Sequence, residues 1–184
     1  MNDLGGGFGN PAHDGARAFR ALLDAMARPG RIVTAQAAAA PGLSPAAATV
    51  ALTLCDPDTP VHLAGEAVRA AEWIGFHCGA PRATQSACTF AFGAWDALTP
   101  LAPYPIGTSD YPDRSATLVV EVPTLSGEGP RLTGPGIDGE TTLSLPDAGA
   151  LRANAAGFPL GLDFIFTCGD RLACLPRSTR IGEA

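Results

Sequence analysis

The sequence predicts one α/β domain in which helices cover a single sheet. Its 184 residues fit the usual size of one domain and can bury a sizeable core. Helix-like and strand-like segments alternate in the first half, and strands dominate the second half. Hydrophobic residues make up 46% and charged residues 16%, which argues against disorder. We expect the domain to span residues 13–184, after a flexible, glycine-rich N-terminal arm at residues 1–12.

Two helices are predicted in the first 56 residues. An apolar stripe at helical spacing marks the first, and Pro29-Gly30 ends it. The stripe consists of Phe19, Leu22, Leu23 and Met26. Ser44 is the expected N-cap of the second helix and Pro45 its first residue, and that helix ends at Asp56-Pro57.

The elements that follow are short. Strands are expected at 31–34, 61–64, 87–92, 118–122, 131–133 and 141–145, and helices at 66–76 and 146–155. Strands at 162–168 and 171–175 form a predicted hairpin around a two-residue turn. In that register Cys174 faces Ile165, so Cys168 and Cys174 are not bonded to each other and are expected as buried free thiols.

Composition excludes several classes of function. A net charge of -6 disfavours non-specific binding of nucleic acid or anionic membranes. Every one of the 12 basic residues is an arginine, so neither an internal pyridoxal phosphate (PLP) Schiff base nor a P-loop can form. Five cysteines without C-x-x-C spacing, no signal peptide and no long apolar run indicate a cytoplasmic protein without a membrane span. The three histidines lack zinc spacing, so no metal site is predicted.

Ser44 and His77 are the candidates for catalysis. The segment around Ser44 approaches a nucleophile elbow but lacks its last glycine, and helix capping explains the serine as well. His77 falls at a helix end, where it can interact with the terminal carbonyl groups. Asp56 and Asp58 could hold magnesium, but the prolines around them favour a turn.

Two polar loops are the candidates for ligand binding, together with His77. The first loop offers Ser109, Asp110 and Arg114, and the second offers Arg131, Thr133, Gly134 and Gly136. Arginines and backbone N–H groups in such loops can bind anions such as ATP or a phosphonate. The alternatives are an ordinary solvated loop, arginines that pair with local carboxylates or hold a subunit interface, and glycines that only supply turn conformations.

Several blocks of sequence, in one order along residues 17–180, carry a family resemblance. They include Leu52-Thr53-Leu54, Asp58-Thr59-Pro60-Val61, Phe76-His77, Arg131-Leu132-Thr133-Gly134-Pro135-Gly136, Phe158-Pro159-Leu160-Gly161 and Leu175-Pro176-Arg177. Together they resemble the H-subunit family of the carbon-phosphorus lyase machinery for phosphonate breakdown.

The resemblance implies a three-layer α/β/α sandwich around a mixed sheet, similar to the large domain of PLP-dependent transferases but lacking PLP and any other cofactor. It implies a homodimer in isolation and a core complex with the G, I and J subunits, acting with the L subunit. That complex joins a phosphonate to the ribose triphosphate moiety of ATP, with loss of adenine. The family offers no catalytic set to carry over. We therefore expect an assembly subunit that is inactive alone; the alternative is an independent hydrolase that uses Ser44 or His77.

Overall fold

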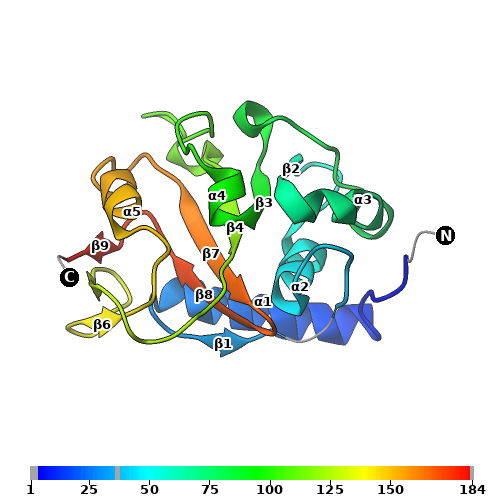
Figure 1. The fold of residues 1–184 in the computed structure, drawn as a ribbon, viewed down its shortest axis with the longest axis horizontal. Coiled ribbons are helices and arrows are strands. Elements are labelled where there is room, and N and C mark those ends of the chain that lie inside the picture. The colour runs from blue at the N-terminus through cyan, green and yellow to red at the C-terminus, as the bar shows by residue number, and fades with distance from the viewer. Residues whose placement is uncertain (1–3, 36–37, 183–184) are drawn as a thin grey trace.

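A computed structural model of the protein describes residues 4–35 and 38–182. Its main sheet contains β1 (Val33–Thr34), β2 (Val61–Leu63), β3 (Phe90–Ala94), β4 (Thr117–Glu121), β7 (Asp163–Cys168) and β8 (Arg171–Leu175). The strand order is β1-β8-β7-β4-β3-β2 (Figure 1). The neighbouring strands β2, β3, β4 and β7 run parallel to one another. Strand β8 is antiparallel to β7, and β1 is antiparallel to β8. The predicted mixed sheet and α/β class are confirmed.

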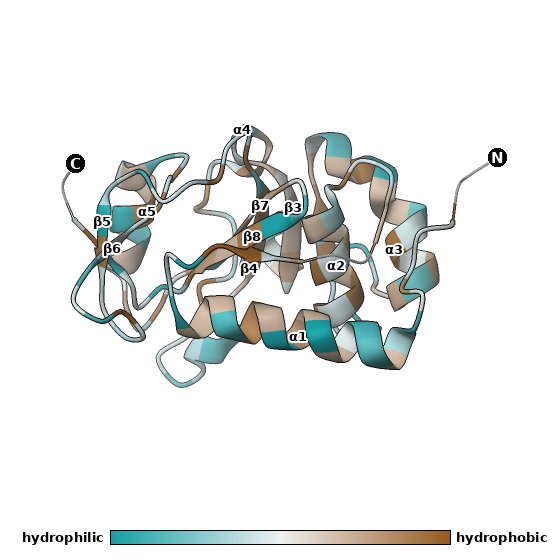
Figure 2. Ribbon diagram, turned by 90° about the horizontal axis from the view of Figure 1, so that it is seen from below, coloured by the Kyte–Doolittle hydropathy of each residue, from teal (hydrophilic) through white to brown (hydrophobic). Residues whose placement is uncertain are grey.

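Side chains of the central strands alternate between two cores. Val119 and Ile165 point to the side that we call the first face, covered by α1 (Pro11–Ala27), α2 (Pro45–Leu54) and α3 (Ala71–Cys78). Their neighbours Leu118 and Phe164 point to the second face. Two helices, α4 (Trp95–Leu98) and α5 (Ala148–Ala155), lie on the second face with a smaller sheet. The short helices η1 (Gly65–Ala70), η2 (Gln85–Ala87) and η3 (Pro112–Arg114) lie in connections. Figure 2 shows α1 lying along the sheet, with α2 and α3 toward one end.

The smaller sheet corrects the expectation that all strands share one sheet. It contains β5 (Arg131–Thr133), β6 (Thr141–Thr142) and β9 (Arg180–Ile181) in the antiparallel order β6-β5-β9. Only the middle residue of β5, Leu132, is buried, and it belongs to the second-face core. The two residues of β5 that flank Leu132 are exposed, and β5 pairs with β6 and with the unpredicted β9.

The predicted N-cap of α2 is present, whereas two other helices begin at residues other than those predicted. The Ser44 hydroxyl accepts a hydrogen bond from the Ala47 N–H at 3.2 Å, and Pro45 begins α2. Helix α1 already begins at Pro11, because the Asn10 side chain caps it, so it includes the last two residues assigned to the arm. The helix predicted at 66–76 starts as η1 and becomes α-helical only from Ala71.

The carboxyl-terminal hairpin has the predicted register. Cys174 pairs with Ile165, and Cys168 pairs with Arg171. All five cysteines are free. Cys174 is buried, whereas Cys168 is only partly buried, so the expectation of two buried thiols holds for Cys174 alone. No helix among the described residues is long and apolar enough to cross a membrane.

Candidate functional site

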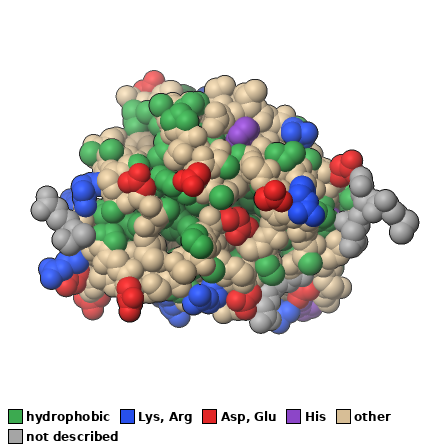
Figure 3. Space-filling view, in the orientation of Figure 1, with side chains coloured by type: hydrophobic (Ala, Val, Ile, Leu, Met, Phe, Trp, Pro, Cys, Tyr) green, Lys and Arg blue, Asp and Glu red, His purple; other side chains and the backbone are tan. Residues whose placement is uncertain are grey.

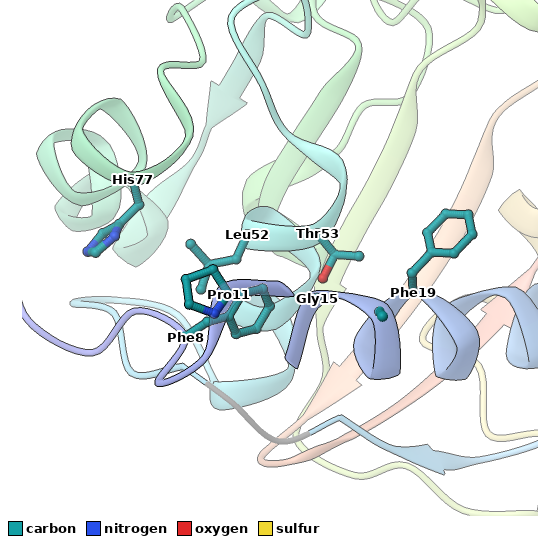
Figure 4. A pocket seen from close by; sticks show the side chains of 8 residues that line it. Phe8, Pro11, Gly15, Phe19, Leu52, Thr53 and His77 are labelled. Carbon is teal, nitrogen blue, oxygen red and sulfur yellow. The ribbon is translucent and has the colours of Figure 1, made fainter. Parts of the chain in front are cut away.

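A cavity of about 530 Å³ opens where α1, α2 and the end of α3 meet. Leu52 and Thr53 extend from α2 toward α1, with His77 at one end and Phe19 at the other (Figure 4). Its remaining lining comes from Phe8, Pro11, Gly15 and Ala16. The Thr53 hydroxyl donates to the Thr49 carbonyl at 2.6 Å. The cavity combines apolar side chains with polar groups, and His77 is the one titratable side chain among the described residues that line it.

His77 holds the N-terminal segment. Its Nε2 lies 2.9 Å from the Leu4 carbonyl oxygen, and because a carbonyl can only accept, Nε2 carries the proton. The ring lies against Trp73, with centroids 4.6 Å apart, and edge-on to Phe76. We expected His77 to interact with the carbonyl groups at the end of its own helix, and the structure gives Leu4 as its partner instead.

Ser44 serves the helix rather than a reaction. Besides capping α2 through its hydroxyl, it donates its backbone N–H to the Glu121 carboxylate at 2.7 Å. Glu121 also accepts from the Thr167 hydroxyl at 3.1 Å. The negative carboxylate lies at the positive end of α2, where the helix dipole favours it. Among the residues that the structure describes, no base is hydrogen-bonded to the Ser44 hydroxyl, so the arrangement does not support nucleophilic attack.

The buried thiols are poor nucleophiles. Burial raises the pKa of Cys78 to about 11 and that of Cys174 to about 12. Both thiols therefore stay protonated at neutral pH.

Asp56 and Asp58 form a turn, in which the Asp58 N–H donates to the Asp56 carboxylate at 2.9 Å. Within residues 4–35 and 38–182 no group of three or more His, Cys, Asp or Glu side chains could hold a metal ion.

The predicted ligand residues do not gather at one place. His77 ends α3, whereas Arg131 and Thr133 lie in the smaller sheet, and these elements are at opposite ends of the molecule (Figures 1 and 2). Arg131 pairs with Glu140 at 3.4 Å, and both side chains are mostly exposed. On the face seen in Figure 3, basic and acidic side chains are scattered among hydrophobic ones.

Gly134 and Gly136 make the turn that follows β5. Both have positive φ angles, of 132° and 81°. A Cβ on Gly136 would lie 1.9 Å from the Ala27 carbonyl oxygen, so the turn packs directly against the end of α1. The turn conformation and this close approach account for both glycines without a bound anion.

The loop with Ser109, Asp110 and Arg114 is tied to the main sheet by a residue that we did not single out. Ser109 and Asp110 are exposed, and the Arg114 guanidinium stacks 3.9 Å above the Tyr111 ring. Pairing with a local carboxylate was one alternative for Arg114, and the structure gives this ring contact instead.

Arg177 connects this loop to the main sheet. Its guanidinium forms two hydrogen bonds with the Asp163 carboxylate, at 3.1 and 2.5 Å, and a third with the Pro112 carbonyl at 2.6 Å. Only 12% of the Arg177 side chain and 20% of the Asp163 side chain are exposed. Both residues lie in blocks that carry the family resemblance, which was the one signal in the sequence that could have pointed to them.

Comparisons with known proteins agree over nearly the whole chain. Residues 6–182 match the family described as bacterial phosphonate metabolism protein (PhnH). A Rhizobium meliloti (strain 1021) protein named alpha-D-ribose 1-methylphosphonate 5-triphosphate synthase subunit PhnH is 42% identical over 189 residues, covering 96% of this chain and 94% of that protein. A Stutzerimonas stutzeri protein named putative C-P lyase subunit protein HtxG is 34% identical over 172 residues, covering 89% and 84%.

Proposed function

The chain belongs to the PhnH family of bacterial phosphonate metabolism proteins, and we therefore propose that it is the H subunit of a carbon-phosphorus lyase complex. The observation that carries this proposal is the 42% identity, across almost the full length of both chains, to a subunit of alpha-D-ribose 1-methylphosphonate 5-triphosphate synthase. The proposed reaction transfers the ribose 5-triphosphate moiety of ATP to a phosphonate and releases adenine.

In this proposal the chain acts mainly in assembly. It forms a homodimer alone, and in the cell it joins the G, I and J subunits in the cytoplasm and acts with the L subunit. Its side chains support this role more than catalysis, because Ser44 caps a helix and His77 binds a backbone carbonyl. Several large apolar side chains are at least half exposed and available to a partner: Phe19, Leu23, Phe76 and Phe158.

The proposal includes no cofactor. The fold is proposed to be similar to the large domain of PLP-dependent transferases, but the sequence contains no lysine that could form a Schiff base with PLP. A borohydride-trapped adduct of PLP on an internal residue would contradict this part of the proposal.

Reconstitution tests the proposed function. Purified G, I, J and L subunits are mixed with ATP and methylphosphonate, with and without this chain, and adenine release is measured. We expect release only when this chain is present, and none from this chain alone. Undiminished release without the chain, or robust release from the chain alone, would contradict the assembly role.

We propose that the two candidate ligand-binding loops contact the anionic substrates of the complex. Arg114 and Arg131 are the arginines in question, because both side chains are exposed. Arg114→Ala and Arg131→Ala are compared in the reconstituted complex at fixed subunit stoichiometry. Lost assembly would assign the arginine to an interface. Intact assembly with unchanged nucleotide affinity and turnover would remove it from the ligand site.

A further inference from the structure

The folded body of the protein binds the N-terminal segment 4–8 mainly through the backbone of that segment. Three consecutive carbonyl groups accept hydrogen bonds: Leu4 from His77 Nε2 at 2.9 Å, Gly5 from Trp73 Nε1 at 2.8 Å, and Gly6 from the Ala39 N–H at 3.0 Å. Two of the donors are side chains of α3 and one is backbone. A row of donors placed for successive carbonyl groups recognises a peptide through its backbone.

The groove is nonetheless selective at two positions. Gly6 has a φ of 84°, and a Cβ there would lie 2.1 Å from the Ala39 carbonyl oxygen. A Cβ on Gly7 would lie 2.8 Å from His77 Cε1, closer than side-chain carbon atoms approach one another. Both positions therefore require glycine, the first because of backbone strain and the second because the chain passes directly over the imidazole.

An aromatic anchor follows these glycines. The Phe8 side chain lines the cavity between α1 and α2, and its ring lies over Gly15, where a Cβ would be 3.7 Å from Phe8 Cε2. Underneath the segment, Trp73 is only 1% exposed and belongs to the first-face core. The segment therefore closes an aromatic and apolar groove that is built into the folded body.

From these contacts we propose that the surface formed by Trp73, His77 and the α1–α2 cavity is a peptide-docking groove. It takes a segment with two glycines followed by an aromatic residue. Its occupant is the chain's own segment 4–8, which acts as a latch that can leave and be replaced by the same sequence supplied on another molecule.

The test uses the full chain with Trp95→Phe, so that Trp73 is the only tryptophan. Gly6→Ala and Gly7→Val are added together to open the latch. Gly127→Ala is the matched control, because a Cβ at Gly127 meets nothing within 4 Å. Acrylamide quenching of Trp73 fluorescence reports access to the groove. The probe is a blocked hexapeptide with the sequence of residues 4–9, Leu-Gly-Gly-Gly-Phe-Gly.

We expect quenching to rise several-fold in the opened variant and to stay at the parent level in the control. The hexapeptide should then restore protection saturably, at concentrations on the order of millimolar, because a tethered segment has an effective concentration in that range. A hexapeptide with alanine in place of Gly6 should fail to restore it. Unchanged quenching in an opened variant that keeps its far-UV circular dichroism, or no protection by the hexapeptide, would overturn the proposal.

Two further measurements keep the test decisive if the opened variant does not fold. In the parent chain, exchange of the Trp73 indole N–H should be slow, because it donates to Gly5; exchange at the rate of a free indole would contradict the latch. Quenching of the parent should also be independent of protein concentration. Quenching that rises on dilution would show that a second copy supplies the segment, and would overturn the assignment within one chain.

Discussion

The two faces of the main sheet are built from different residues. Alanine is the commonest residue in the first-face core, whereas leucine is the commonest in the second-face core. Small side chains let α1 and α2 lie close to the sheet, but they leave grooves between the helices, and Phe19 at such a groove is half exposed. The second face is filled by large side chains. The two faces thus fill their cores in different ways, the first with small side chains that bring helices close to the sheet and the second with large ones.

The largest expected difference is between two phenylalanines. Phe166 is fully buried on the second face and stacks on Phe164 with ring centroids 6.1 Å apart. Phe166→Ala should lower the free energy of unfolding by about 3–5 kcal/mol, from lost burial and the cavity left behind. Phe19→Ala, at the first-face groove, should change it by no more than about 0.5 kcal/mol. Urea unfolding of both variants measures the two losses of free energy of unfolding, and equal losses would contradict the expected difference.

The ion pair between Arg177 and Asp163 should be nearly as important. Arg177→Met leaves the Asp163 carboxylate mostly buried without its partner, which should cost about 3–5 kcal/mol. Asp163→Asn combined with Arg177→Met should cost less than the sum of the two single changes, since the pair acts as a unit. Arg131→Met is the control, because its pair with Glu140 is mostly exposed and should contribute no more than about 1 kcal/mol. Additive losses in the double variant would contradict this account.

Overpacking tests the alanine-rich face. Ala48 in α2 is fully buried, so Ala48→Leu should destabilise the protein by about 1–3 kcal/mol, as side chains and backbone move to make room. Ala153→Leu in α5 places the same side chain on an exposed site and should have little effect. Thermal unfolding of the two variants is the measurement. A tolerated Ala48→Leu would mean that the helices of the first face are not closely packed.

The smallest effect concerns glycines of α3. Gly75 is inside the helix, and an added Cβ would meet nothing within 4 Å, so Gly75→Ala should stabilise the fold by about 1 kcal/mol. Gly79 ends the same helix with a φ of 68°, and Gly79→Ala should destabilise it. Opposite signs in thermal unfolding would support this distinction, and equal signs would contradict it.

Patterns in the sequence predicted the helices and strands that depend only on neighbouring residues. Ser44-Pro45 begins α2 because capping needs only neighbouring residues, and runs of apolar residues place β4, β7 and β8 to within one residue. The smaller sheet could not be predicted in this way, since β5 pairs with β9, a strand far along the chain. The α-helical part of the predicted helix at 66–76 begins late, because a glycine-led 3-10 turn precedes it.

The site was harder to predict, since its contacts join distant residues. His77 and Trp73 bind Leu4 and Gly5, about 70 positions earlier, and no periodicity signals such a contact. Arg177 reaches both Asp163 and Pro112 for the same reason. Residues with suggestive composition, such as Gly134 and Gly136, have a local explanation in a turn that packs on α1.

We propose that this chain contributes to phosphonate breakdown through assembly rather than through catalytic groups of its own. Turnover per assembled complex, measured as adenine released from ATP and methylphosphonate, tests it with Ser44→Gly and His77→Gln in this subunit. Each variant should keep turnover within about twofold of the unaltered complex, because general acid–base or nucleophilic groups contribute far more than that. A loss on the order of 100-fold or more in a fully assembled complex would contradict the claim, since that is the effect of removing a group that takes part in the reaction.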